Sequence, residues 1–108
     1  MNKTTFAAKL KALQRAHAKL LKRRNRPRKE GNGIFDRYEN PVLTAEHTPL
    51  EWRYDFNHAS NPHLMTRLGI NAVFNVGAME FDTKIELMAR VEGWNRKSFF
   101  AIAEGKTG

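Results

Sequence analysis

Three residues in the C-terminal half of the chain, Asn75, Arg90 and Arg96, have side chains suited to binding a polar ligand. The amide of Asn75 would supply both a donor and an acceptor to adjacent hydroxyls. Arg90 lies within an expected strand, where a cation must be paired or face a cavity. Structural roles remain open for all three, because Asn often marks a sheet edge and Arg96 could be a solvated loop charge.

Two histidines, His58 and His63, form the other pair that could do chemistry. Their spacing suggests two ligands of a metal ion, but no third ligand follows at close spacing, so we expect no metal site. We interpret both as exposed or hydrogen-bonded loop residues. The chain has no cysteine, which excludes a disulfide framework, a thiolate metal site and a cysteine nucleophile.

The pattern of residues 70–108 predicts an antiparallel β-meander. This meander must position Asn75, Arg90 and Arg96. Apolar and β-branched residues recur over three segments, residues 71–81, 85–91 and 98–103. Residues 82–84 are a candidate for a tight turn. A sheet with apolar residues on both faces needs neighbours on both sides, as the stacked blades of a propeller have. We therefore expect an incomplete domain of a larger β-architecture.

Residues 1–29 form a basic leader. They contain eleven Lys or Arg and no acidic residue, whereas the remainder has eight basic and eleven acidic side chains, so the formal charge of +8 belongs to the leader. Apolar residues and one histidine recur at helical spacing: Phe6, Leu10, Leu13, His17, Leu20 and Leu21. The pattern predicts a helix over residues 5–24, capped by Thr4 or Thr5 and ended by Pro27, Gly31 and Gly33.

This basic amphipathic helix has three interpretations: a contact with nucleic acid or an anionic membrane, a helix that binds a partner, or a docked helix with a solvated outer face. Its apolar stripe is narrow and has no Trp, which disfavours the membrane surface. Only Phe6 could stack on bases, so charge alone supports nucleic acid weakly. No apolar run approaches the roughly 20 residues that span a bilayer, and no signal-peptide apolar region is present. We expect a soluble, cytoplasmic protein.

Residues 30–69 predict a loop-rich segment with little regular structure. Pro41 and Pro49 precede two short extended pieces, at residues 42–44 and 50–56. A short helix is expected after Asn61, with Asn61 as its N-cap and Pro62 in the first turn, ended by Gly69.

Several segments in a fixed order carry a resemblance that spans about sixty residues. They are NPVLTAEHTP at 40–49, WRYD at 52–55, FNVGA at 74–78, RVEG at 90–93 and RKSFF at 96–100. In these segments the chain resembles the N-terminal region of glycoside hydrolase family 130, specifically its phosphorylases of mannosyl-glucose. The resemblance also covers the leader helix and its exit at residues 31–33.

The resemblance implies a mainly β fold, a five-bladed β-propeller in the complete protein, of which this chain is the N-terminal helix and first antiparallel blade. It implies inverting phosphorolysis, in which inorganic phosphate, a co-substrate rather than a cofactor, converts β-1,4-mannosyl-glucose into α-mannose 1-phosphate and glucose. Such chemistry needs one carboxylic acid on the leaving oxygen. The family's acid lies beyond residue 108, so we expect no catalytic residue here and interpret Asp82, Glu86 and Glu92 as structural.

The resemblance implies that five residues of this chain bind the sugar. Asn75 matches a family position that faces the pocket from an inner strand, and Gly77 would permit close backbone approach. Arg96 is expected at the pocket mouth, Arg90 in the wall, and Arg53 and Tyr54 at the rim. The partners implied are the disaccharide, phosphate, the rest of the propeller and further copies of the protein, which we expect the leader helix to contact.

We expect residues 1–108 alone to be inactive. Two other classes of function stay open: a standalone nucleic-acid-binding module that uses the basic leader, and a degenerate sugar-binding remnant without a partner. Binding that falls steeply with salt would support the first of these.

Overall fold

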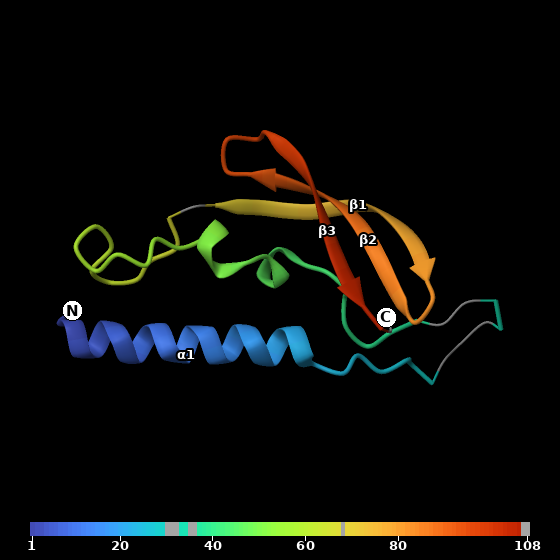
Figure 1. The fold of residues 1–108 in the computed structure, drawn as a ribbon, viewed down its shortest axis with the longest axis horizontal. Coiled ribbons are helices and arrows are strands. Elements are labelled where there is room, and N and C mark those ends of the chain that lie inside the picture. The colour runs from blue at the N-terminus through green and yellow to red at the C-terminus, as the bar shows by residue number, and fades with distance from the viewer. Residues whose placement is uncertain (30–32, 35–36, 68, 107–108) are drawn as a thin grey trace.

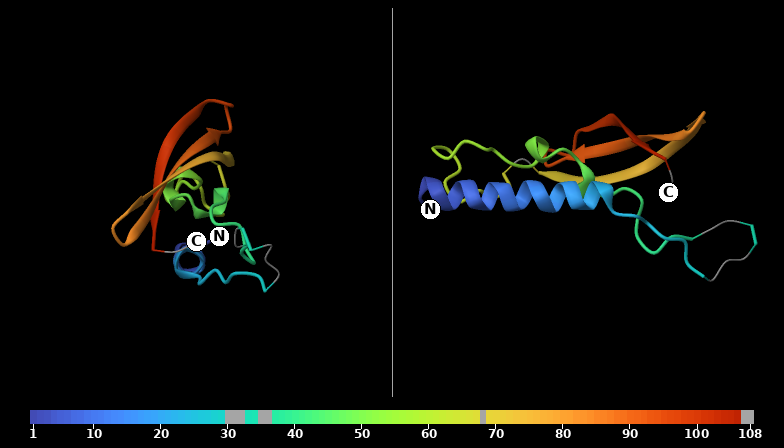
Figure 2. Two further views of the ribbon diagram at one scale, coloured as in Figure 1. Left: turned by 90° about the vertical axis from the view of Figure 1, so that its right-hand side faces the viewer. Right: turned by 60° about the horizontal axis from the view of Figure 1, so that its bottom comes forward.

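The chain folds into three layers: a helix, an irregular segment that runs beside it, and an antiparallel sheet (Figure 1). The end-on view in Figure 2 places the irregular segment between the helix and the sheet. In this computed structural model, the described residues are 1–29, 33–34, 37–67 and 69–106, with the backbone but not the side chains of residues 75 and 76. Residues 31 and 32, which follow the predicted leader helix, lie outside the described residues.

Helix α1 spans Lys3–Lys22, close to the predicted 5–24. Its N-cap is Asn2, whose side chain accepts a hydrogen bond from the Thr5 amide at 2.8 Å, so the expectation of a Thr4 or Thr5 cap was wrong. The helix ends before Pro27, with Arg23 as its C-cap. No described helix is both long and apolar enough to cross a membrane.

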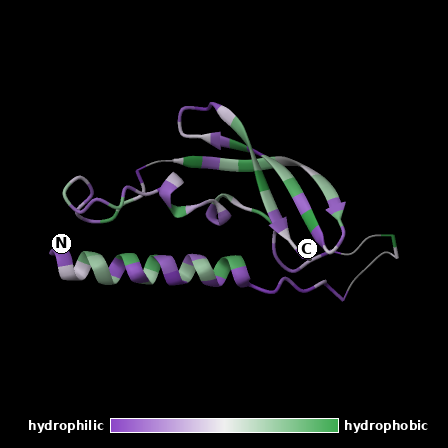
Figure 3. Ribbon diagram, in the orientation of Figure 1, coloured by the Kyte–Doolittle hydropathy of each residue, from purple (hydrophilic) through white to green (hydrophobic). Residues whose placement is uncertain are grey.

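One face of α1 docks on the irregular segment, and the opposite face is basic. Apolar and polar residues alternate along the helix in Figure 3. The docked face carries the less exposed side chains, which are Phe6, Leu10, Leu13, His17 and Leu20. At 3.6 residues per turn, Lys11, Arg15, Lys19 and Lys22 fall on the far side, and all four are exposed. We call these four residues the basic ridge.

The irregular layer contains two 3₁₀ turns, η1 (Ala45–His47) and η2 (Leu50–Trp52). The second replaces the extended piece predicted at 50–56, which was therefore wrong. Tyr54 makes only an isolated antiparallel bridge to Thr66.

The short helix predicted after Asn61 is also absent from the described residues up to 67, which form turns. The Asn61 side chain does not cap a helix. It is fully buried, its amide donates to the carbonyls of Asp55 and Met65 at 2.9 Å each, and its oxygen accepts from the Met65 amide at 3.0 Å. These bonds close the loop on itself. The Asn61 side chain is used for them and therefore cannot cap a helix.

The sheet is the predicted meander. It consists of β1 (Ile70–Phe81), β2 (Lys84–Gly93) and β3 (Ser98–Gly105) in the order β1-β2-β3, all antiparallel. The turn predicted at 82–84 is present, with Asp82 at a positive φ of 46°. Between the pairs Phe74↔Arg90 and Gly77↔Met88 the register shifts, which marks a bulge at residues 75 and 76.

The two faces of the sheet differ in their environment. The face toward the irregular layer is covered, with Ala89 and Val91 buried and Trp52 packed edge-on against Phe99 at a ring distance of 5.2 Å. The opposite face, here called the outer face, exposes large apolar side chains: Met79, Phe81, Met88, Phe100 and Ile102. The described fold is therefore a helix and one open antiparallel sheet.

Candidate functional site

Arg90 lies on the outer face of β2, where its position in a strand required a partner. The partner is an aromatic ring, since the guanidinium carbon of Arg90 lies 4.6 Å from the centroid of Phe74. Its Nε donates to the Ser98 hydroxyl at 3.3 Å. The guanidinium is thus held from two sides while the residue stays exposed, an arrangement that suits a ligand with hydroxyl or anionic oxygens.

Arg96 sits at the tip of the loop between β2 and β3 and is exposed. Its φ of 63° lies in the left-handed region, which is uncommon for a residue with a Cβ and indicates a loop shape imposed by its hydrogen bonds. The Arg96 amide donates to the Gly93 carbonyl at 2.9 Å. Ser98, two residues further on, contacts Arg90, so the hairpin places both predicted arginines at one end of the sheet.

Asn75 belongs to β1 and lies in the bulge, opposite Ala89 of β2. Its side chain is outside the described residues, so its predicted contact with a ligand stays a prediction. Gly77, next along the strand, has no atom within 4 Å of the position that a Cβ would take. Open space, rather than crowding by the protein itself, surrounds this glycine.

Arg53 and Tyr54 follow η2 in the irregular layer. The Arg53 guanidinium lies 5.7 Å from the Tyr54 ring centroid and donates through Nη2 to the Glu46 carbonyl at 3.0 Å. Its Nε is buried without a partner among the described residues. Because Trp52 beside them covers the inner face, these two residues lie across the sheet from Arg90. The described structure therefore does not bring all five predicted residues into one pocket.

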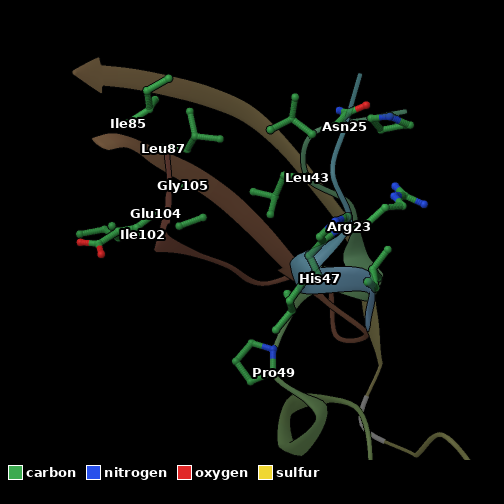
Figure 4. Close-up of a pocket in the computed structure, with 15 residues that line it drawn as sticks. Arg23, Asn25, Leu43, His47, Pro49, Ile85, Leu87, Ile102, Glu104 and Gly105 are labelled. Carbon is green, nitrogen blue, oxygen red and sulfur yellow. The ribbon is translucent and has the colours of Figure 1, made fainter. Parts of the chain in front are cut away.

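Two adjoining cavities do lie between the sheet and the layers beneath it, with volumes of about 410 and 430 Å³. The first opens between the end of α1, the loop from Pro41 to Pro49 and strands β2 and β3 (Figure 4). Most of its lining residues are aliphatic, and the polar ones are Arg23, Asn25, His47 and Glu104. Of the predicted sugar-binding residues whose side chains are described, which are Arg53, Tyr54, Arg90 and Arg96, none lines either cavity.

His47 is a titratable group that lines both cavities. Its Nδ1 accepts a hydrogen bond from the Thr44 amide at 3.0 Å and lies 2.8 Å from the Thr44 hydroxyl. Burial, with a further contribution from the Arg23 charge, lowers the pKa of His47 below its usual value. The neutral ring is therefore the form that the fold favours.

The carboxylates that could have been mistaken for a catalytic acid have structural surroundings. Asp82 forms the β1–β2 turn, and Glu86 pairs with Lys84 at 3.4 Å. Lys84 Nζ also donates a hydrogen bond to Glu104 Oε1 at 3.2 Å, and this bond raises the pKa of Lys84. These contacts give Asp82 and Glu86 structural roles at the β1–β2 turn.

The histidines at 58 and 63 secure α1 to the irregular layer. His58 Nε2 bonds the Met1 carbonyl at 2.8 Å, and its ring packs edge-on against Phe6 at 5.1 Å. The His63 carbonyl accepts a hydrogen bond from Lys9 Nζ at 2.8 Å. Among the described residues, no cluster of three or more acidic, histidine or cysteine side chains could hold a metal ion.

Sequence reasoning missed Phe74 and Ser98, which hold Arg90. Phe74 faces Arg90 directly across β1 and β2, so a register between the two strands would have indicated this pair. The register depends on the bulge at 75 and 76, which the apolar pattern of the strand does not reveal.

No family model matches the chain. A curated protein does: over 103 residues the chain is 52% identical to the 4-O-β-D-mannosyl-D-glucose phosphorylase of Bacteroides fragilis. The match covers 95% of this chain but only 26% of that enzyme, so the chain spans about a quarter of its relative's length. The resemblance inferred from the residues is confirmed: the chain is similar to the N-terminal region of a mannosyl-glucose phosphorylase.

Proposed function

We propose that this chain is the N-terminal part of a glycoside phosphorylase that cleaves β-1,4-mannosyl-glucose with inorganic phosphate. The observation that supports this most is the 52% identity along 95% of the chain to an enzyme with that name. The aligned region covers 95% of the chain, so it includes most of both the helix and the sheet. The proposed protein is a cytoplasmic enzyme of carbohydrate metabolism.

The proposed reaction inverts the anomeric carbon. A phosphate oxygen attacks C1 of the mannosyl unit, the bond from C1 to the bridging oxygen breaks, and a carboxylic acid gives its proton to that oxygen. The products are α-mannose 1-phosphate and glucose. We assign the acid to a part of the protein outside residues 1–108, which contribute sugar binding through Asn75, Arg90, Arg96, Arg53 and Tyr54.

The proposed complete fold is a five-bladed β-propeller with this sheet as its first blade. The apolar outer face supports the idea, because side chains such as Met88 and Phe100 are 53% and 73% exposed in this chain and would be covered by a neighbouring blade.

The decisive experiment incubates the longer protein with mannosyl-glucose, with and without phosphate, and follows the products by ³¹P NMR. We expect a phosphate-dependent signal of α-mannose 1-phosphate together with free glucose. Release of mannose without any need for phosphate would identify a hydrolase instead. Residues 1–108 tested in the same assay should give no product.

For the leader helix we propose contacts between subunits of a homo-oligomer. The exposed basic ridge supports an interaction surface there. Removing residues 1–29 from the longer protein should then reduce its size in gel filtration, and an unchanged assembly would contradict the proposal.

The same ridge favours a second candidate, a nucleic-acid contact. It predicts binding of a labelled oligonucleotide with a steep dependence on salt, which replacing Lys11, Arg15, Lys19 and Lys22 by Gln would abolish.

A further inference from the structure

The loop between β2 and β3 exposes a large aromatic residue. Trp94 keeps 69% of its surface accessible, whereas the other tryptophan, Trp52, packs against Phe99. An exposed indole is the kind of surface group that usually has something to bind, since its apolar body gains free energy when covered.

Hydrogen bonds within the loop fix its shape. The Gly93 amide donates to the Lys97 carbonyl, and the Arg96 amide donates to the Gly93 carbonyl, both at 2.9 Å. The Asn95 side-chain oxygen accepts from the Lys97 amide at 3.1 Å. A loop closed by three such bonds holds its side chains in one arrangement, which lowers the entropy lost when a ligand binds.

The loop is also attached to the start of β1. The Trp94 amide donates to the Gly69 carbonyl at 2.8 Å, and the Asn71 side chain donates to the Gly93 carbonyl at 3.0 Å. Gly69 has to be glycine for this approach, because a Cβ there would lie 2.8 Å from the Cβ of Trp94. Backbone contacts therefore hold Trp94 in place while its ring stays free.

The surroundings of the ring indicate the kind of ligand. Asn95, Arg96 and Lys97 flank it in the loop and are all exposed, so the ring lies among polar groups rather than in a continuous apolar patch. A protein partner would need a broader apolar centre than one ring. One flat apolar surface bordered by hydrogen-bonding groups instead matches a single sugar ring, which has an apolar face of C–H bonds and an edge of hydroxyls.

We propose that Trp94 stacks against the glucose unit of the disaccharide, with Arg96 hydrogen-bonded to hydroxyls at the edge of that unit. This proposal rests on the proposed phosphorylase function. Glucose fits because its hydroxyls are equatorial, which leaves axial C–H bonds on both faces of the ring, whereas mannose has an axial hydroxyl on one face. Trp94 thereby selects the leaving group, while phosphate and the mannosyl unit bind elsewhere.

The test uses the longer protein in the synthetic direction, with α-mannose 1-phosphate and glucose as substrates. In Trp94→Ala we expect the KM for glucose to rise about tenfold, equivalent to about 1.4 kcal/mol, while the KM for α-mannose 1-phosphate stays within about twofold. Trp94→Phe keeps an aromatic face and should recover part of the affinity. Phe56→Ala, which removes an exposed aromatic residue outside the loop, is the control and should match the wild type.

Each outcome is distinct. If the wild-type protein shows no reaction that depends on phosphate, the proposed function fails and the stacking role fails with it. If the wild type is active but Trp94→Ala leaves the KM for glucose unchanged, only the stacking role is wrong. A large fall in the unfolding temperature of Trp94→Ala without a change in KM would instead mean that Trp94 packs against another part of the protein, which also overturns the proposal.

Discussion

At the scale of single residues, Asn61 is the strongest local determinant of the irregular layer. Its side chain is 0% exposed and satisfies three backbone groups of the loop from Asp55 to Met65. These part-buried bonds join the two ends of the loop through the buried Asn61 amide.

We predict that Asn61→Ala lowers the free energy of unfolding by about 2–3 kcal/mol, because it leaves buried polar groups without partners. Asn61→Asp should also destabilise, since a carboxylate keeps the acceptor but loses both donors. Asn57→Ala, at an exposed position of the same loop, is the control and should have a smaller effect. Equal effects of the substitutions at 57 and 61 in denaturant unfolding would contradict this role.

The site residues differ in how far the sequence could predict them. The resemblance singled out Arg90, but only the strand register places it over Phe74. Arg96 was expected in a loop, and its positive φ depends on hydrogen bonds that the residue types do not specify. The sequence did not indicate Trp94, the residue that we propose to stack on glucose. Its position beside a turn does not show whether a tryptophan is exposed or buried.

At the scale of elements, two histidines lie where α1 meets η1. His17 Nε2 bonds the Thr48 carbonyl at 3.0 Å, and His47 accepts a hydrogen bond from the Thr44 amide. The ionisable groups that affect His47 are Arg23, the C-cap of α1, His17 from α1 and Glu46 from η1. A proton on Nδ1 of His47 would end its role as an acceptor and add a charge beside Arg23.

This contact predicts a pH dependence. The folded state lowers the pKa of His47, so the unfolded chain binds the proton more readily, and stability should fall as the pH drops below about 6.5, the unfolded value. We expect the unfolding temperature to decrease between pH 7.5 and 5.5, and the decrease to be smaller in His47→Gln. His63→Gln is the matched control, since that side chain is exposed. If the unfolding temperature of His47→Gln falls with pH as steeply as that of the wild type, His47 is not the source of the pH dependence.

Regular elements were predicted better than the irregular layer for a physical reason. The strands and α1 are specified by apolar periodicity, a property of the local sequence, and only their ends moved. The fold of residues 45–67 depends instead on bonds to distant partners, such as Lys9 to His63 and His58 to Met1. A short segment such as 50–56 can be extended or a 3₁₀ turn until those partners are known.

At the scale of the whole molecule, residues 1–108 and the longer protein that we propose should differ in the solvent exposure of the outer face of the sheet. Met79 and Met88 are 59% and 53% exposed in this chain. A neighbouring blade would exclude solvent and oxidants from both sulfur atoms.

We predict that dilute hydrogen peroxide oxidises Met79 and Met88 rapidly in residues 1–108 and at least about tenfold more slowly in the longer protein, because burial limits access of the oxidant. Peptide mass spectrometry gives the rate at each methionine. Met1, at the exposed start of the chain, serves as the reference. Equal rates in the two proteins would mean that nothing covers the outer face.

The bulge at residues 75 and 76 has a consequence for insertions and deletions. Two residues stand opposite Ala89 there, so the alternation of β1 changes phase between Phe74 and Gly77. Met79 and Phe81 consequently share a face with Phe74. In a variant shortened by one residue at the bulge, Phe74 and Gly77 would be two positions apart, so a regular ladder would keep Met79 and Phe81 on the outer face. A single-residue gap at this point of an alignment would therefore mark a sheet that lacks the bulge but keeps the apolar outer face, whereas a gap between residues 78 and 81 would exchange the two faces at the end of β1.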